Sequence, residues 1–153
     1  MNPGEDEAAF REFVSVAEPR LFRALVAAYG PHRGSEATAE ALAYGWEHWA
    51  FVRTLDNPTG YLYRVGQSRT KPRRVPRLFQ RPDAAESWVE PQLGAALSRL
   101  TQAERVAVVL VFAADLSVKE VAELLGVSSS TVKTNTKRGL RKLRKALGVI
   151  ASG

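Results

Sequence analysis

The sequence predicts an all-α protein with two small helical domains joined by a Pro-rich linker. Apolar residues recur three and four positions apart, and alternating segments flanked by turn dipeptides are missing. Four prolines from residue 71 to residue 91 exclude a long helix there, because each fixes φ and removes an amide donor. A chain of 153 residues has room for two very small domains. We expect these domains at 5–71 and 92–148, with 72–91 as a flexible linker.

The helices expected in the first domain are at about 6–29, at 36–51, and from Pro58 to a point before Pro72. Pro19 should kink or break the first helix. Residues 31–34 are predicted to form a loop, after which Ser35 caps the second helix. Asn57 followed by proline indicates a helix start, with an N-cap residue and then proline at the first helical position.

The helices expected in the second domain are at about 92–100, 102–114, 118–125 and 129–147. Thr101 and Glu104 have the spacing of a capping box at the start of the second of these helices. Ser117 should cap the third helix, and Gly126 should end it in a left-handed conformation. Gly148 should end the fourth.

Net positive charge is confined to two short stretches. The formal net charge is +6 and the sequence pI is about 10.0. Residues 71–82 carry five basic and no acidic side chains, and residues 133–147 carry seven basic and no acidic ones. Such clusters are typical of proteins that bind the phosphates of nucleic acids. A solvated helical face is the alternative for either cluster.

Several other classes of protein are excluded. The absence of cysteine excludes disulfides, thiolate metal sites and cysteine nucleophiles, and two histidines are too few for a His-rich metal site. No Gly-rich phosphate loop or nucleophile constellation supports an enzyme, and no cofactor is expected. No apolar run approaches the roughly 20 residues of a membrane span. The acidic N-terminus lacks the layout of a signal peptide, so we expect a cytoplasmic protein without membrane insertion.

The strongest motif is a helix-turn-helix pattern between Val118 and Leu140. Ala122 is small enough for close helix packing, and Gly126 suits the turn four positions later. The residues expected to fill the angle between the helices are Val118, Val121, Leu125, Val127 and Val132. The predicted inner stripe of the last helix is Val132, Thr136, Leu140, Leu143 and Leu147. The residues predicted to face DNA are Ser129, Ser130, Thr131, Lys133, Thr134, Lys137, Arg138 and Arg141. The alternative is a charged surface helix on an ordinary bundle.

Residues 100–147 resemble region four of a bacterial sigma factor, through the stretches 116–134 and 138–144. The output domains of response regulators share much of this pattern. Residues 36–49 and 57–65 resemble region two, and no room is left for a region three domain. The layout is similar to that of the extracytoplasmic-function sigma factors. The resemblance implies a protein that binds core RNA polymerase and promoter DNA, with an anti-sigma protein as a further partner.

Acidic residues on the predicted helix 36–51 suit the polymerase partner. The acidic side carries Glu36, Glu40 and Glu47, which fall within about 40° on a helical wheel. Leu42, Trp46 and Trp49 lie on the opposite side, where we expect the core. The resemblance implies that the acidic side binds a basic coiled coil of the large polymerase subunit. A solvated acidic face is the alternative.

The loop 53–57 lies where this family captures a base flipped out of the minus-ten element. An unstacked base is read on its exposed edges and by stacking. The residues implied here are Arg53, Leu55, Asp56, Asn57, Tyr61 and Arg64. Tyr63 is a further candidate for stacking or phosphate contact. Alternatively, Asn57 is only a helix cap and Tyr61 only a core residue.

The predicted function is that of a sigma factor, which directs core RNA polymerase to a two-part promoter and is not itself an enzyme. The alternative is a stand-alone helix-turn-helix regulator that acts without core polymerase. The acidic and aromatic helix predicted over 36–51 favours the sigma factor.

Overall fold

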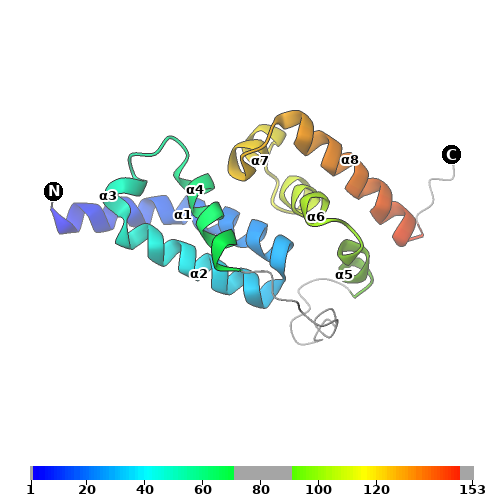
Figure 1. Cartoon of the computed structure of the whole chain (residues 1–153), viewed down its shortest axis with the longest axis horizontal. Coiled ribbons are helices and arrows are strands. Elements are labelled where there is room, and N and C mark those ends of the chain that lie inside the picture. Colours follow the sequence, from blue (N-terminus) through cyan, green and yellow to red (C-terminus); the bar gives the residue numbers. More distant parts are fainter. Residues whose placement is uncertain (1, 71–90, 149–153) are drawn as a thin grey trace. The chain divides into compact units, whose positions relative to one another are not determined.

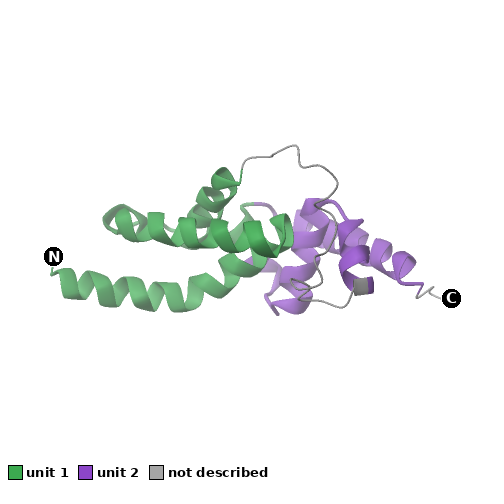
Figure 2. Ribbon diagram, turned by 90° about the horizontal axis from the view of Figure 1, so that it is seen from below, with its two compact units in different colours: residues 1–71, 123–126 green, residues 72–122, 127–153 purple. Residues whose placement is uncertain are grey.

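The computed structural model describes residues 2–70 and 91–148, and within these ranges it contains helices and no strand (Figure 1). The all-α prediction is confirmed. The chain divides into two compact units, one with residues 1–71 and 123–126 and the other with 72–122 and 127–153 (Figure 2). The predicted linker, apart from the backbone of Pro91, lies outside the described residues.

The first unit contains α1 (Pro3–Tyr29), α2 (Pro31–Glu47), α3 (Trp49–Val52) and α4 (Pro58–Arg69). After α1, the chain reverses within one residue, so that α2 returns alongside it, and α4 packs against both (Figure 1). The largest fully buried side chains here are Leu21, Leu25, Val52 and Leu62. Asn57 caps α4 as predicted, because its Oδ1 accepts the Gly60 N–H at 3.0 Å.

The predicted loop at 31–34 is wrong, since these residues form the first turn of α2. Gly30 ends α1 with φ +92°, and Pro31 then occupies the first helical position, where its missing N–H costs nothing. Ser35 is therefore not a cap. A Cβ on Gly34 would lie 2.5 Å from the Cα of Val26, so this glycine permits the close contact between α1 and α2.

Pro19 was predicted to kink or break the first helix, and the break does not occur, because α1 continues through it. Pro19 lies on the exposed side, while Ala17 and Leu21 on either side are buried. A proline inside a helix removes one backbone hydrogen bond, and helical stability in proteins comes mostly from packing of the apolar face. The buried residues around Pro19 therefore keep the helix continuous.

The predicted helix 36–51 is divided, with α2 ending at Glu47 and α3 beginning at Trp49. Trp49 is buried as expected and packs against Phe10 and Phe13, with ring centroids 5.2 and 5.3 Å apart. Trp46 is 46% exposed, contrary to the prediction. The buried side of α2 consists of small residues, namely Gly34, Ala37, Thr38, Ala41 and Gly45. The tryptophans therefore lie at its margin and beyond its end.

The helices of the C-terminal half are α5 (Pro91–Ser98), α6 (Gln102–Val108), the π-helical turn η3 (Val109–Ala113), α7 (Val118–Leu125) and α8 (Ser129–Ala146). Both α5 and α6 pack against α8. The capping box of Thr101 and Glu104 is confirmed. A second capping box begins α7, because Ser117 Oγ accepts the Glu120 N–H at 3.0 Å and Glu120 Oε1 accepts the Ser117 N–H at 2.9 Å. The sequence analysis identified only the Ser117 half of it.

The inner side of α8 is shorter than predicted. Val132 and Leu143 are buried, whereas Leu147 is 39% exposed, because α8 ends at Ala146. Gly139 is buried where α8 crosses α6, and a Cβ there would lie 2.6 Å from Val108 Cγ2. The glycine thus sets the distance between these helices.

The packing of α7 also differs in detail from the prediction. Val121, Ala122 and Leu124 are buried, while Leu125 is only partly so. Val127 is exposed, contrary to the prediction, because it follows the turn that ends the helix. Within residues 2–70 and 91–148, no helix has the length and apolar character needed to cross a membrane.

Candidate nucleic-acid interface

The turn between α7 and α8 has the geometry of a glycine-ended helix. Gly126 has φ +70°, a conformation that costs other residues steric strain. Its N–H donates to the Glu123 carbonyl at 3.3 Å, and the Val127 N–H donates to the Ala122 carbonyl at 3.1 Å. These two bonds form a Schellman motif. The prediction for Gly126 is confirmed, and the motif determines where α8 begins.

Ser128 caps α8 and links the hydroxyls of its first turn. Its Oγ accepts the Thr131 N–H at 3.1 Å. The same Oγ lies 3.1 Å from Ser130 Oγ and 2.8 Å from Thr131 Oγ1. The first turn of α8 therefore presents a preorganised group of hydroxyls, which can donate to or accept from phosphates or base edges.

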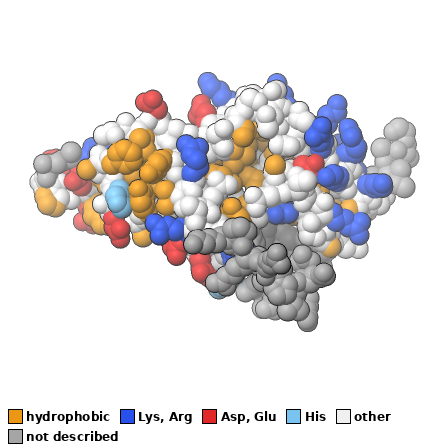
Figure 3. Space-filling view, in the orientation of Figure 1, with side chains coloured by type: hydrophobic (Ala, Val, Ile, Leu, Met, Phe, Trp, Pro, Cys, Tyr) orange, Lys and Arg blue, Asp and Glu red, His pale blue; other side chains and the backbone are white. Residues whose placement is uncertain are grey.

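All the α8 residues predicted to face DNA are exposed: Ser129, Ser130, Thr131, Lys133, Thr134, Lys137, Arg138 and Arg141. Lys and Arg side chains gather over the half of the molecule that contains α8 (Figure 3). In the described part of the chain, none of these basic side chains makes an ion pair. Their charges are thus available to an anionic partner. Their contact with DNA stays a prediction.

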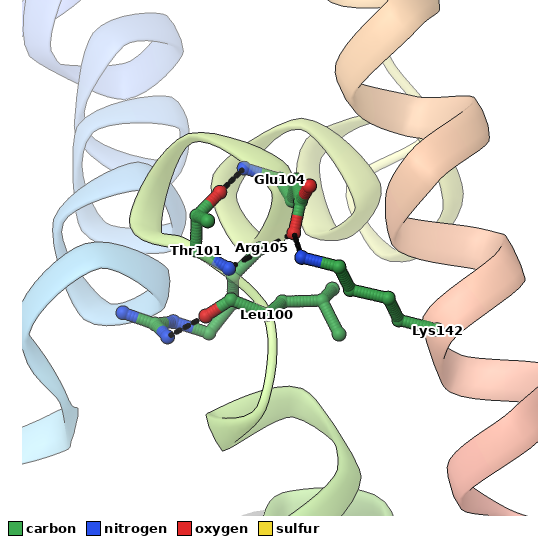
Figure 4. Close-up of polar contacts among 5 residues, drawn as sticks. All are labelled: Leu100, Thr101, Glu104, Arg105 and Lys142. Atoms are coloured by element: carbon green, nitrogen blue, oxygen red, sulfur yellow. Dashed lines mark hydrogen bonds and ion pairs between the residues drawn. The ribbon is translucent and has the colours of Figure 1, made fainter.

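The basic residue Lys142 behaves differently. Its Nζ lies 2.7 Å from Oε1 of Glu104, a residue of α6 that is only 5% exposed (Figure 4). Lys142 is thus directed toward the neighbouring helix, although it belongs to the same cluster of basic residues. The sequence cluster alone does not distinguish it from the others.

The residues predicted to contact the minus-ten element differ in their exposure and in their contacts with other side chains. Arg53 Nη1 pairs with Asp6 Oδ1 at 3.0 Å, and its guanidinium carbon lies 5.8 Å from the centroid of the Trp49 ring. Leu55 is half-buried, and Asp56 and Arg64 are exposed. The loop is therefore anchored at Arg53 and open around Asp56.

Tyr61 belongs to a group that we call the aromatic cluster, formed by Tyr44, His48, Phe51 and Tyr61. The hydroxyls of Tyr44 and Tyr61 lie 3.2 Å apart, a hydrogen bond that raises the pKa of Tyr44 above its ordinary value. The His48 ring stacks on Tyr44 with centroids 4.0 Å apart, and Phe51 meets Tyr61 edge-on at 5.7 Å. Phe51 is 50% exposed, so the cluster presents aromatic surface to solvent.

The sequence analysis missed three members of this cluster. Tyr44 and His48 are one turn apart near the end of α2, which was a usable signal. Phe51 lies on α3 and Tyr61 on α4, so their meeting depends on tertiary packing. The interpretation of Tyr63 as a stacking residue is wrong, because it is buried, and burial raises the pKa of its hydroxyl.

The acidic side of α2 is exposed and continuous. Glu36, Glu40 and Glu47 all lie on this one helix, so their alignment holds. His32 Nε2 lies 2.7 Å from Glu36 Oε1. No group of three or more His, Asp or Glu side chains that could hold a metal ion occurs among the described residues.

The comparisons with known proteins agree with this architecture. Residues 91–143 match the family described as sigma-70, region 4. The chain is similar to the sigma factor RpoE of Bartonella quintana, solved in complex with the anti-sigma factor NepR. The TM-score is 0.63 and the identity 16%, and the match covers 93% of this chain and 98% of that chain. No protein of curated function matches this sequence.

The helix-turn-helix of α7 and α8 lies inside the residues that match sigma-70, region 4. Residues 91–143 thus match sigma-70, region 4, and the chain as a whole has the fold of a sigma factor. The resemblance seen in the sequence is confirmed at this level.

Proposed function

We propose that this chain binds core RNA polymerase and directs it to a two-part promoter. The observation that carries the proposal is the exposed basic side of α8, which follows a helix-turn-helix turn inside a sigma-70 region 4 domain. A recognition helix of this kind lies in the major groove with its N-terminal residues on base edges. The chain supplies specificity and no chemistry of its own, so it needs no cofactor.

The minus-35 element is the ligand proposed for α8. Base edges are reached from the first turns of this helix, which contain Ser129, Ser130, Lys133 and Thr134. Thr131 contributes its hydroxyl to the set of neighbouring hydroxyls at the start of the helix. Lys137, Arg138 and Arg141 lie further along the helix and meet phosphates. Phosphate contacts position a protein on the duplex, and base contacts specify the sequence.

The minus-ten element is the ligand proposed for the first unit. The residues involved are those predicted from the sequence (Arg53, Leu55, Asp56, Asn57, Tyr61 and Arg64), joined by the exposed members of the aromatic cluster. Aromatic rings beside basic side chains bind single-stranded DNA by base stacking. The Oδ1 of Asn57 is engaged in the cap of α4, so the part proposed for this residue is to shape the loop.

The remaining assignments concern partners and boundaries. The acidic side of α2 would dock on a basic surface of core polymerase, and an anti-sigma protein would bind this chain as NepR binds RpoE. The functional domains would be 5–71 and 92–148, joined by 72–91. The protein would act in the cytoplasm.

Transcription in vitro tests the proposal. The chain is mixed with core polymerase and a library of duplexes randomised upstream of a reporter, and the transcripts are sequenced. We expect chain-dependent transcripts that begin at a fixed distance downstream of a two-part consensus. A stand-alone regulator would instead bind duplex DNA without core polymerase and give no chain-dependent transcript.

A further inference from the structure

The basic stretch of α8 contains one lysine that contacts another helix. Residues 133–147 carry seven basic side chains, and among the described residues only Lys142 of this group makes an ion pair. Its Nζ lies 2.7 Å from Glu104 Oε1 (Figure 4). Lys142 therefore links α8 to the first turn of α6.

Glu104 is already part of the α6 capping box. Its Oε1 accepts the Thr101 N–H at 3.0 Å, and its own N–H donates to Thr101 Oγ1 at 3.2 Å. The same Oε1 is the atom that Lys142 contacts. One nearly buried carboxylate oxygen thus joins the cap of α6 to the recognition helix. The hydrogen bonds from Lys142 and Thr101 lower the pKa of Glu104, so the carboxylate stays ionised.

The ion pair lies close in sequence to two buried residues of α8, Gly139 and Leu143. Gly139 brings α8 near Val108, and Leu143 is buried one turn later. Apolar contact is non-directional and tolerates some rotation of one helix on the other. A charge-assisted hydrogen bond has a preferred direction and length. Lys142 therefore adds a directional interaction to the contact between α6 and α8, which Gly139 and Leu143 cannot supply.

We propose that the Glu104–Lys142 pair is a positioning device that sets the rotation of the recognition helix on α6, and that Lys142 is not a phosphate ligand. The proposal rests on the proposed DNA binding by α8. Lys133 lies nine residues before Lys142, about 14 Å along a helix. A small rotation at the pair therefore changes which base edges Lys133 and Thr134 reach.

The test uses the full chain, four single variants and the double variant with Lys142→Met and Glu104→Gln. Lys142→Met keeps the length of the side chain and removes its charge. Glu104→Gln keeps an acceptor for the Thr101 N–H and also removes a charge. Lys142→Arg restores the charge, and Lys137→Met is the matched control for a proposed phosphate ligand. The DNA probes are the duplex selected in the transcription experiment and its single-base minus-35 variants.

We expect Lys137→Met to reduce the salt dependence of log K by about one unit, with base preference retained. Lys142→Met should leave the salt dependence of log K unchanged. It should lower the ratio of affinities for the best duplex and its single-base variants by about fivefold or more, which corresponds to the low end of the free energy of one base contact. Glu104→Gln should also lower this discrimination. The double variant should discriminate as well as Lys142→Met alone, and Lys142→Arg should recover most of the discrimination.

A measurement without DNA separates this proposal from the proposed function. Spin labels at Ala103 on α6 and Thr134 on α8, both exposed, report the distance between the helices. We expect a broader or shifted distance distribution in Lys142→Met and no change in Lys137→Met. An unchanged distribution, or a salt slope reduced as in Lys137→Met, would overturn the positioning role. Failure of the wild-type chain to discriminate any duplex would overturn the proposed function instead, and the spin-label result would still decide whether the pair positions α8.

Discussion

Lys133 and Lys137 are one helical turn apart on the exposed side of α8, yet we expect their replacement to have different effects. Lys133→Ala should cost about 1–3 kcal/mol on the correct minus-35 element and relax base preference at one or two positions. Lys137→Ala should weaken binding about equally for all duplexes and make its salt dependence shallower by about one unit. Binding to single-base minus-35 variants at two salt concentrations measures both. The reverse outcome would show that the register of α8 is wrong.

Phe51 exposes half of its surface beside the predicted minus-ten loop. Loss of a stacking ring costs about 1–3 kcal/mol per base in single-strand binding. We therefore expect Phe51→Ala to weaken binding of a fluorescent single-stranded minus-ten oligonucleotide to the complex with core polymerase. Phe112→Ala is the control, because Phe112 is also exposed but lies in η3. Equal losses in both variants would argue against base stacking by the aromatic cluster.

At the scale of elements, the spacing between helices depends on glycines. A methyl group on Gly34 would lie within 2.6 Å of the backbone of Val26, which cannot move independently of α1. Gly34→Ala should therefore destabilise the protein by about 1–3 kcal/mol, as overpacking does. Thermal unfolding measures this. Gly4→Ala is the control, since its nearest neighbour would be Asn2 Oδ1 at 3.7 Å, and we expect no comparable loss of stability there.

The start of α6 should make stability depend on pH. The pKa of Glu104 is lowered in the folded state, by Lys142 first and by the Thr101 N–H second. Its contribution is therefore complete above the unfolded value of about 4.5 and is lost as the pH falls through the lower, folded value. We expect Glu104→Gln to flatten the fall in Tm over this acidic range. A Tm profile with the same slope as the wild type would contradict the ion pair.

At the scale of the whole molecule, the two units should have separable roles. Reversal of Glu40 and Glu47 to Lys should weaken core polymerase binding and leave the fold intact, because both residues are exposed on α2. Binding of the duplex minus-35 element by α8 should be unchanged. Pull-down of core polymerase at moderate salt measures the first effect. Glu12→Lys with Glu18→Lys, exposed on α1, is the control for net charge, and an equal loss there would mean that this docking face is wrong.

The sequence by itself determined the features that depend on neighbours along the chain. The caps at Asn57, Thr101 and Ser117 were readable because the bond joins residues three positions apart, and Gly126 because its turn needs a positive φ. The exposed basic side of α8 followed from helical periodicity. These features were sufficient to predict the helix-turn-helix.

The tertiary structure alone decided the features that depend on contacts between helices. In the sequence, Gly34 and Gly139 look like loop glycines or interruptions of a helix. A Cβ on Gly34 would meet the backbone of Val26, and a Cβ on Gly139 would meet the side chain of Val108. Phe51 meets Tyr61, and Lys142 meets Glu104, across helices that no local pattern relates. A periodic pattern shows which side of a helix is apolar or charged. Only packing determines which of those side chains contact another helix.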